Sequence, residues 1–202
     1  MITRAIQLND EPSLVFDNPY LRKVQALGID VEEPEDKWPS DGSWRALEHR
    51  FNTVKEFAFA IPNAAAIAAI AKFGPVLEIG AGSGYWAWCL RQVGCDVIAV
   101  DNGSWKFTAS YTEVTTACGI ESAADYPDRT LLSVWPYMDQ MAAAALTRYQ
   151  GKHFAYVGEG EGGCTGTDEM FAHLANWWTV VADIWIPQWP GIRDQLTIYE
   201  RK

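Results

Sequence analysis

The stretch that decides the fold is "VLEIGAGSGYWAWCLRQVGCDVIAVD", residues 76–101. Two apolar runs, 76–80 and 96–101, lie on either side of a glycine-rich turn and a segment of helical composition, 84–94. Continuous apolar strands separated by a helix are typical of a parallel sheet that is buried on both faces. We therefore predict a strand, a helix and a second strand over these three ranges.

The turn contains Gly80, Gly82 and Gly84, which form a G-x-G-x-G pattern. A glycine-rich turn between a strand and a helix lets backbone N–H groups approach a ligand closely. A P-loop would need Lys and Ser or Thr after its last glycine, where this chain has Tyr85 and Trp86. The dinucleotide fingerprint G-x-G-x-x-G would place its third glycine at Tyr85, but spacing alone does not exclude NAD, because an acid about 20 residues further on serves that ligand too.

The segment "EIGAGSG", residues 78–84, resembles the first motif of the class I (Rossmann-like) S-adenosylmethionine-dependent methyltransferases. The resemblance implies S-adenosyl-L-methionine (AdoMet) as the cofactor, S-adenosyl-L-homocysteine as its product, and ribose hydroxyls bound to the carboxylate of Asp101. The cofactor-binding residues that it implies are Glu78, Gly80, Ala81, Gly82, Gly84, Asp101, Asn102 and Trp135. We expect the adenine beside Cys118–Ser122, with Glu121 or Asp125 as the acid near it.

The order of elements after the first helix also fits that family. We predict a helix over 63–74 with Asn63 as its N-cap, strands over 130–136 and 153–159, and helices over 138–151 and 167–177, the last with Thr167 as a possible cap. The segments 180–187 and 195–202 read as a C-terminal hairpin. The fold class is therefore α/β, a three-layer sandwich with a mostly parallel seven-stranded sheet, a C-terminal antiparallel hairpin and an N-terminal helical arm.

The expected organisation is a single domain. Residues 63–202 form the methyltransferase core, and residues 1–62 form an N-terminal arm and helical cap of the same domain. Within that arm we expect residues 1–37 to be loosely packed and residues 38–62 to contain a helix with Ser43 as a possible N-cap. Several segments, among them "GGCTGTDEMF" at 162–171, also look like a poorly characterised bacterial and plant group.

The acceptor site is expected beyond the ends of strands 130–136 and 153–159. The segment "SVWPYMD", residues 133–139, partly resembles the [N/D]-P-P-[Y/F/W] motif of amino-methylating enzymes, but Val134 stands where Asn or Asp is required. The substrate-binding residues that we predict are Trp135, Pro136, Tyr137 and Trp189, and the catalytic residues are Tyr137 and Glu159. Trp38, Trp44 and Phe57–Phe59 are expected to roof the pocket.

The composition of the chain limits the kinds of partner that we expect it to bind. Its 202 residues carry a formal net charge of −10, which disfavours binding to nucleic acid phosphates. The cysteines and histidines lack metal-ligand spacing, no apolar run is long enough to span a membrane, and the N-terminus lacks a signal-peptide pattern, so we expect no metal, no membrane and a cytoplasmic protein.

We predict a methyltransferase that acts on a small-molecule acceptor. The alternatives are methylation of a protein or peptide, a non-catalytic AdoMet-binding module and, less well supported, an NAD-linked oxidoreductase. The sequence leaves the acceptor atom and the oligomeric state open.

Overall fold

The computed structural model describes residues 16–32 and 43–202. Its centre is a seven-stranded sheet with the order β3-β2-β1-β4-β5-β7-β6. The strands are β1 (Val76–Ile79), β2 (Val97–Asp101), β3 (Thr115–Thr116), β4 (Thr130–Val134), β5 (His153–Gly158), β6 (Trp178–Trp185) and β7 (Gln195–Arg201). The first five strands run parallel, whereas β7 runs antiparallel to both β5 and β6. The predicted sheet, with its antiparallel C-terminal hairpin, is confirmed.

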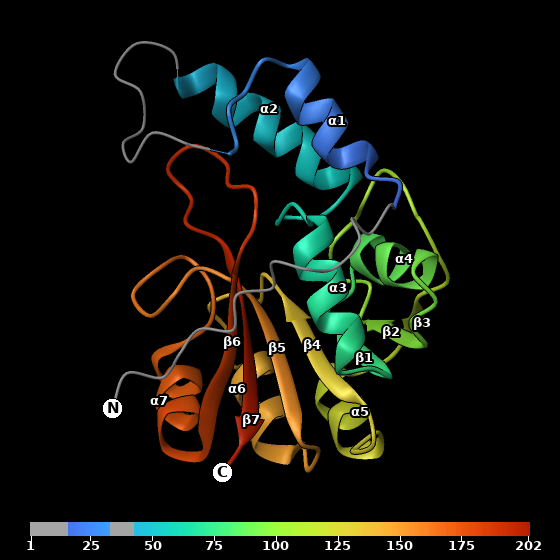
Figure 1. Ribbon diagram of the computed structural model, residues 1–202, viewed down its shortest axis with the longest axis vertical. Helices are drawn as coiled ribbons and strands as arrows, with labels where there is room; N and C mark the ends of the chain where they lie inside the picture. Colours follow the sequence, from blue (N-terminus) through green and yellow to red (C-terminus); the bar gives the residue numbers. More distant parts are fainter. Residues whose placement is uncertain (1–15, 33–42) are drawn as a thin grey trace.

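Helices cover both faces of the sheet (Figure 1). They are α1 (Pro19–Ala26), α2 (Ser43–Glu56), α3 (Ala64–Lys72), α4 (Tyr85–Gln92), α5 (Gly119–Asp125), α6 (Gln140–Arg148) and α7 (Asp168–Trp177). Successive strand residues point to opposite faces. Val76 and Leu132 therefore enter the core beneath α1, α3 and α4, while Leu77 and Leu131 enter the core beneath α5, α6 and α7. These two cores make the predicted three-layer sandwich.

Two of the predicted helix starts have the expected cap. The side-chain oxygen of Asn63 accepts a hydrogen bond from the Ala66 N–H at 2.9 Å, and the Thr167 hydroxyl accepts one from the Met170 N–H at 3.3 Å. Each bond satisfies an N–H group that has no partner inside the first turn. The Asn63 amide also donates to the carbonyl of Trp185, which joins the start of α3 to the end of β6.

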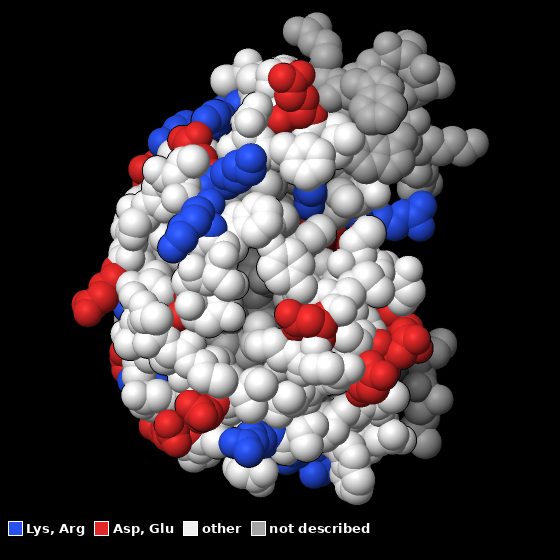
Figure 2. Space-filling model, turned by 180° about the vertical axis from the view of Figure 1, so that it is seen from behind, with Lys and Arg blue, Asp and Glu red and all other residues white. Residues whose placement is uncertain are grey.

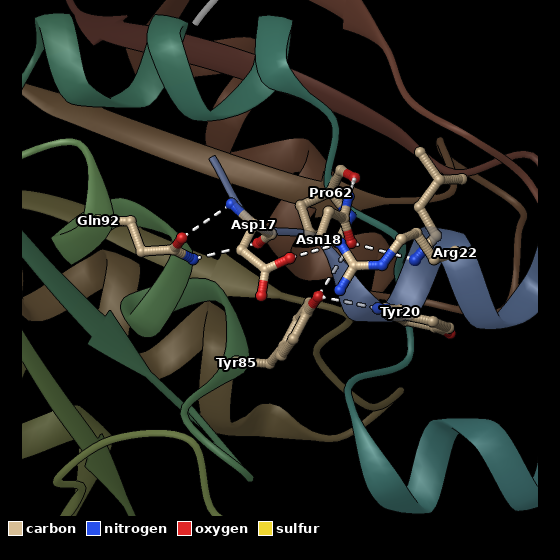
Figure 3. A network of polar contacts seen from close by, with 8 residues as sticks. Asp17, Asn18, Tyr20, Arg22, Pro62, Tyr85 and Gln92 are labelled. Atoms are coloured by element: carbon tan, nitrogen blue, oxygen red, sulfur yellow. Dashed lines mark hydrogen bonds and ion pairs between the residues drawn. The ribbon is translucent and has the colours of Figure 1, made fainter. Parts of the chain in front are cut away.

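The prediction that residues 1–37 pack loosely is wrong for the described residues 16–32. The Asn18 side chain caps α1 by accepting from the Leu21 N–H, and it also donates to the Pro62 carbonyl and accepts from the Tyr85 hydroxyl (Figure 3). Tyr20 and Val24 are fully buried in the core above α3 and α4. The missed signal is the pair Asn18–Pro19, because Asn is a favoured N-cap and Pro is favoured in the first helical turn.

The sheet topology predicts a ligand site at the carboxyl ends of the central strands. β2 and β4 lie on opposite sides of β1, so the chain crosses from one half of the sheet to the other there. In open α/β sheets, ligands bind at such a switch point, beyond the carboxyl ends of the strands. Figure 1 shows α1 and α2 at that end of the parallel strands. Within residues 16–32 and 43–202, no helix is both long and apolar enough to cross a membrane.

Candidate functional site

A cavity of about 140 Å³, here called the inner cavity, lies at the carboxyl ends of β1, β2 and β4. Its lining includes Phe59, Gly80, Gly82, Asp101, Asn102, Trp105, Phe107, Gly119, Ser133 to Tyr137, Asp139 and Met141. Figure 2 shows the face of the molecule opposite to that of Figure 1, which is hollowed near its middle and is mostly uncharged around the hollow. The position of the inner cavity agrees with the site that the glycine turn predicts.

The glycine turn is fixed against the end of β2. Gly80 and Gly82 have φ values of 67° and 55°, in the left-handed region that glycine adopts without strain. The Gly82 N–H donates to Oδ2 of Asp101 at 2.9 Å, and the Gly103 N–H donates to Oδ1 at 2.7 Å. The carboxylate of Asp101 is therefore held in one orientation at the wall of the inner cavity.

The space above the start of α4 is filled by the segment after β2. A Cβ atom added to Gly82 would lie 2.6 Å from the ring of Phe107, and one added to Gly84 would lie 2.8 Å from a methyl group of Val114. The Tyr111 N–H donates to the Ser83 carbonyl at 2.9 Å, which holds this segment on the turn. A dinucleotide pyrophosphate binds at this helix N-terminus in a Rossmann domain. Here protein side chains occupy that position.

An open hollow of about 640 Å³, here called the outer hollow, adjoins the inner cavity. Asn102, Gly119, Asp139 and Met141 line both. The outer hollow is also lined by Thr116 to Ile120, which includes Cys118 to Ile120 of the segment Cys118–Ser122 that we expected beside the adenine. Glu121 and Asp125 are exposed on α5 and are not among its lining residues. The wall at Thr116 to Ile120 thus consists of backbone and uncharged side chains, and the acid that lines the outer hollow is Asp139 rather than Glu121 or Asp125.

Glu78 lies beneath the glycine turn. Its side chain is 2% exposed, and it lines a narrow hollow of about 30 Å³ together with Ala81 and Gly82. Burial raises the pKa of the Glu78 carboxyl to about 8 from an ordinary value of 4.5. Its Oε2 has no hydrogen-bond partner within the described part of the chain. A buried acceptor without a partner is suited to receive a donor from a ligand.

Four aromatic side chains surround the other side of the inner cavity: Phe59, Trp105, Trp135 and Tyr137, here called the aromatic rim. The rings of Phe59 and Trp135 are stacked, with centroids 4.9 Å apart and planes 13° apart. The ring of Tyr137 meets that of Phe59 edge-on at 6.0 Å, and the ring of Trp105 lies 6.3 Å from that of Tyr137. The rim presents flat, mostly apolar walls with the polar tips of Trp and Tyr.

Trp135 is held in an unusual conformation. Its φ is 53°, the left-handed region that bulky residues rarely adopt. Its indole N–H donates to Oδ1 of Asp194 at 2.8 Å. Asp194 is 1% exposed, and burial raises the pKa of its carboxyl to about 7, against the lowering effects of that hydrogen bond and of the Arg50 charge. Residues in such strained backbone conformations cluster at functional sites.

Most of the predicted site residues lie at the inner cavity or at the narrow hollow beside it. Gly80, Gly82, Asp101, Asn102, Trp135, Pro136 and Tyr137 line the inner cavity. Glu78 and Ala81 line the narrow hollow, and Gly84 is the N-cap of α4. Phe59, one of the predicted roof residues, is part of the rim, whereas Trp38 and the side chain of Trp44 lie outside the described residues.

The structure does not bring Glu159 or Trp189 into the inner cavity. The carboxylate of Glu159 accepts hydrogen bonds from the Cys164 and Arg193 N–H groups, at 2.7 and 2.9 Å. Trp189 is 1% exposed, and its indole N–H donates to the Tyr20 hydroxyl. Neither residue is among the described residues that line the inner cavity. Glu159 thus joins two loops, and Trp189 joins the β6–β7 connection to α1.

Sequence reasoning missed several residues of this region, among them Trp105 and Phe107 in the inner cavity and Arg50 and Asp194 beside Trp135. Phe107 and Trp105 belong to the irregular segment after β2, and Arg50 belongs to α2, so no motif marks them. Asp194 was part of the predicted hairpin connection, without a role. Among the described residues, no group of three His, Cys, Asp or Glu side chains is placed to hold a metal ion.

Several solved structures are similar to this chain at low sequence identity. No family model matches the sequence, and no curated protein does. A magnesium protoporphyrin IX methyltransferase from Synechocystis, solved with bound AdoMet, is similar in structure at 9% identity and a TM-score of 0.49, over 83% of this chain and 87% of that one.

Two further solved structures are similar. The N-methyltransferase NodS from Bradyrhizobium japonicum matches at 16% identity and a TM-score of 0.44, over 92% of this chain and 99% of that one. A 1,6-didemethyltoxoflavin-N1-methyltransferase from Burkholderia thailandensis matches at 18% identity and a TM-score of 0.44, over 84% of this chain and 94% of that one. At these levels the likenesses say nothing about the activity of this chain. The strand order and the antiparallel β7 define the fold. The fold is that of the class I methyltransferases.

Proposed function

We propose that this protein is an AdoMet-dependent methyltransferase that transfers a methyl group to a small-molecule acceptor. The observation that carries the proposal is the glycine turn held against Asp101 at the switch point of the sheet, with the outer hollow on one side and the aromatic rim on the other. AdoMet matches this arrangement, because its flat adenine would lie at the outer hollow and its reactive methyl group would face the aromatic rim.

The residues present fit AdoMet. The Asp101 carboxylate keeps acceptor capacity for ribose hydroxyls beside the two N–H groups that it already binds, because two carboxylate oxygens have about four lone-pair sites. The adenine fits the wall at Cys118–Ile120, and the methionine part lies over Gly80, where an added Cβ would meet only Met141, at 3.5 Å. Glu78 is the buried acid nearest to the turn and suits the ammonium group.

The same contacts argue against a dinucleotide. NAD needs an open helix N-terminus for its pyrophosphate. Phe107 and Val114 fill the space around Gly82 and Gly84, so phosphate oxygens cannot reach the first N–H groups of α4 without displacing them. AdoMet carries no phosphate and does not require that space.

The contribution of the protein to transfer is mainly alignment. When bound, AdoMet would supply an electrophilic methyl group on a sulfonium for displacement by the acceptor. The aromatic rim fixes the plane of the acceptor, and such positioning accounts for a large share of rate acceleration. Burial raises the pKa of the Tyr137 hydroxyl, so Tyr137 stays protonated near neutral pH and orients the acceptor as a donor rather than removing a proton.

The size of the inner cavity favours a small acceptor. Its volume of about 140 Å³ admits a small ring or a side-chain-sized group beside the turn. We place the cap, residues 1–62, in the same domain as the core, because Phe59 belongs to the rim and Asn18 binds Tyr85 of α4. All four cysteines are free, which suits the reducing cytoplasm that we propose as its compartment.

Calorimetry tests the cofactor and a transfer assay tests the reaction. We expect S-adenosylhomocysteine to bind with a stoichiometry of one and NAD⁺ to give no heat of binding. Radiolabelled methyl groups from AdoMet should then appear in the low-molecular-weight fraction of a metabolite extract. Binding of NAD⁺ in place of S-adenosylhomocysteine would overturn the cofactor assignment, and label in proteins alone would replace the small-molecule acceptor with a polypeptide.

A further inference from the structure

The guanidinium of Arg50 is buried without its usual partners. Arg50 belongs to α2, and only 6% of it is exposed. Its Nε and Nη2 atoms have no hydrogen-bond partner in the residues that the structure describes. These two nitrogens carry the parallel N–H groups of one guanidinium edge, which bind a carboxylate in bidentate fashion. A buried charged donor pair needs an acceptor that these described residues do not supply.

The Arg50 guanidinium lies beside the aromatic rim. Its central carbon is 4.9 Å from the ring centroid of Trp135 and 5.9 Å from that of Phe59. The two rings are themselves 4.9 Å apart. If Trp135 separated Arg50 from Phe59, the distance to Phe59 would approach the sum of the other two distances. It is much shorter, so Trp135 does not separate Arg50 from Phe59. The guanidinium lies within cation–π distance of both rings, and these rings, not Arg50 itself, line the inner cavity.

The acidic groups near Arg50 do not use the two free nitrogens. Asp194 binds the Trp135 indole through Oδ1, and its Oδ2 has no partner among the described residues. The carboxylate of Glu159 is engaged by the Cys164 and Arg193 N–H groups. Burial raises the pKa of Asp194, and the interaction with Glu159 raises the pKa of the Cys164 thiol; the positive charge of Arg50 opposes both increases. The cluster therefore combines a free donor pair, a free acceptor and a neighbouring flat apolar wall.

We propose that Arg50 anchors the carboxylate of an aromatic acid, and that such an acid is the methyl acceptor. The inference rests on the proposed methyltransferase function and names the chemical class of its substrate. The carboxylate accepts two hydrogen bonds from Nε and Nη2, and the ring lies against Phe59 and Trp135. A hydroxyl or amine next to the carboxylate donates to Oδ2 of Asp194. Guanidinium and ring together select a flat anion over a neutral or aliphatic molecule.

The test uses benzoate as the probe and benzamide as its neutral counterpart of the same shape. Each is titrated into the full-length protein, with and without saturating S-adenosylhomocysteine, by ligand-observed NMR. We expect benzoate to bind at least tenfold more tightly than benzamide. Arg50→Lys keeps the positive charge but loses the paired N–H groups, and should weaken benzoate at least tenfold while benzamide is unchanged. Arg50→Gln should abolish the difference between the two probes.

Arg22→Lys is the matched control, because Arg22 is an exposed arginine on α1 that pairs with Asp17. It should bind both probes as the wild type does. Unchanged affinity of the Arg50 variants for S-adenosylhomocysteine shows that they are folded.

Equal binding of benzoate and benzamide to the wild type overturns the proposal, as does equal benzoate binding by wild type and Arg50→Lys. If S-adenosylhomocysteine does not bind but benzoate still depends on Arg50, the acid site stands and the proposed cofactor fails.

Discussion

The two sides of the inner cavity are built in different ways. The cofactor side consists of backbone and carboxylates from two short segments, 78–84 and 101–103, and its key contact joins the Gly82 N–H to Asp101. The acceptor side consists of side chains from distant segments: Phe59 and Trp135 line it, and Arg50 and Asp194 contact Trp135 from outside the cavity. A site made of local backbone has a sequence signature, whereas a site made of distant side chains does not. The two sides should therefore also respond differently to mutation.

The largest effect is expected on the cofactor side, from Asp101→Ala. This change removes the acceptor for the Gly82 and Gly103 N–H groups and for the ribose. Hydrogen bonds to a charged group contribute about 1.5–3 kcal/mol each, so affinity for S-adenosylhomocysteine should fall roughly 100-fold in calorimetry. Asp125→Ala is the control, because Asp125 is exposed on α5 and should bind as the wild type does. A loss of equal size in both variants would contradict the assignment of Asp101.

Trp135→Phe tests the acceptor side. Phenylalanine keeps a ring against Phe59 but leaves Oδ1 of the buried Asp194 without its donor. An unsatisfied buried acceptor costs about 1–3 kcal/mol, which urea denaturation would measure. The same energy, applied to the transition state as the rim shifts, should lower turnover roughly tenfold. Affinity for S-adenosylhomocysteine should stay within about threefold of the wild-type value. A loss of cofactor affinity comparable to that of Asp101→Ala would show that the two sides are not separable.

Glu78→Gln tests the cofactor side through the pH dependence of the free energy of unfolding. The Glu78 pKa is about 8 in the folded protein against an ordinary value of 4.5. Between these values the folded state keeps a proton that the unfolded state has lost, so its contribution to the free energy of unfolding falls as pH rises. The slope is at most about 1.4 kcal/mol per pH unit, and it disappears above the folded pKa.

Denaturation of the wild type and of Glu78→Gln between pH 5 and 9 measures the difference. The variant should lose less stability with rising pH than the wild type. Glu121→Gln, on the exposed face of α5, should keep the wild-type dependence. Parallel curves for the wild type and Glu78→Gln would mean that Glu78 is ionised in the folded state.

The smallest effect is expected from Tyr137→Phe. The change removes one hydroxyl donor and keeps the ring beside Phe59, 6.0 Å away. One hydrogen bond contributes about 1 kcal/mol, so turnover should fall roughly fivefold, and cofactor affinity should not change. The measurement is kcat and KM for a transferred methyl group, together with calorimetry of S-adenosylhomocysteine. A loss of more than two orders of magnitude would instead assign the Tyr137 hydroxyl to proton transfer.

The difference between local features and contacts between distant side chains also explains which parts of the structure could be predicted from the sequence. The strands, the hairpin and the caps at Asn63 and Thr167 follow from local periodicity and side-chain chemistry, and they are confirmed. The docking of Tyr20 against Phe57 and Tyr85 depends on contacts across the chain and was missed. Glu159 looked free at the end of a strand, yet its carboxylate is engaged by the N–H group of Arg193, 34 residues away. Only the folded chain shows which polar groups already have partners.

A crystal structure with S-adenosylhomocysteine tests the central claim most directly. The account predicts that the ribose hydroxyls lie within hydrogen-bond distance of Asp101, with the adenine against Cys118–Ile120 and the sulfur facing Trp135 and Tyr137. Adenine bound on the rim, or a ligand that avoids Asp101 and the turn 80–84, would contradict it.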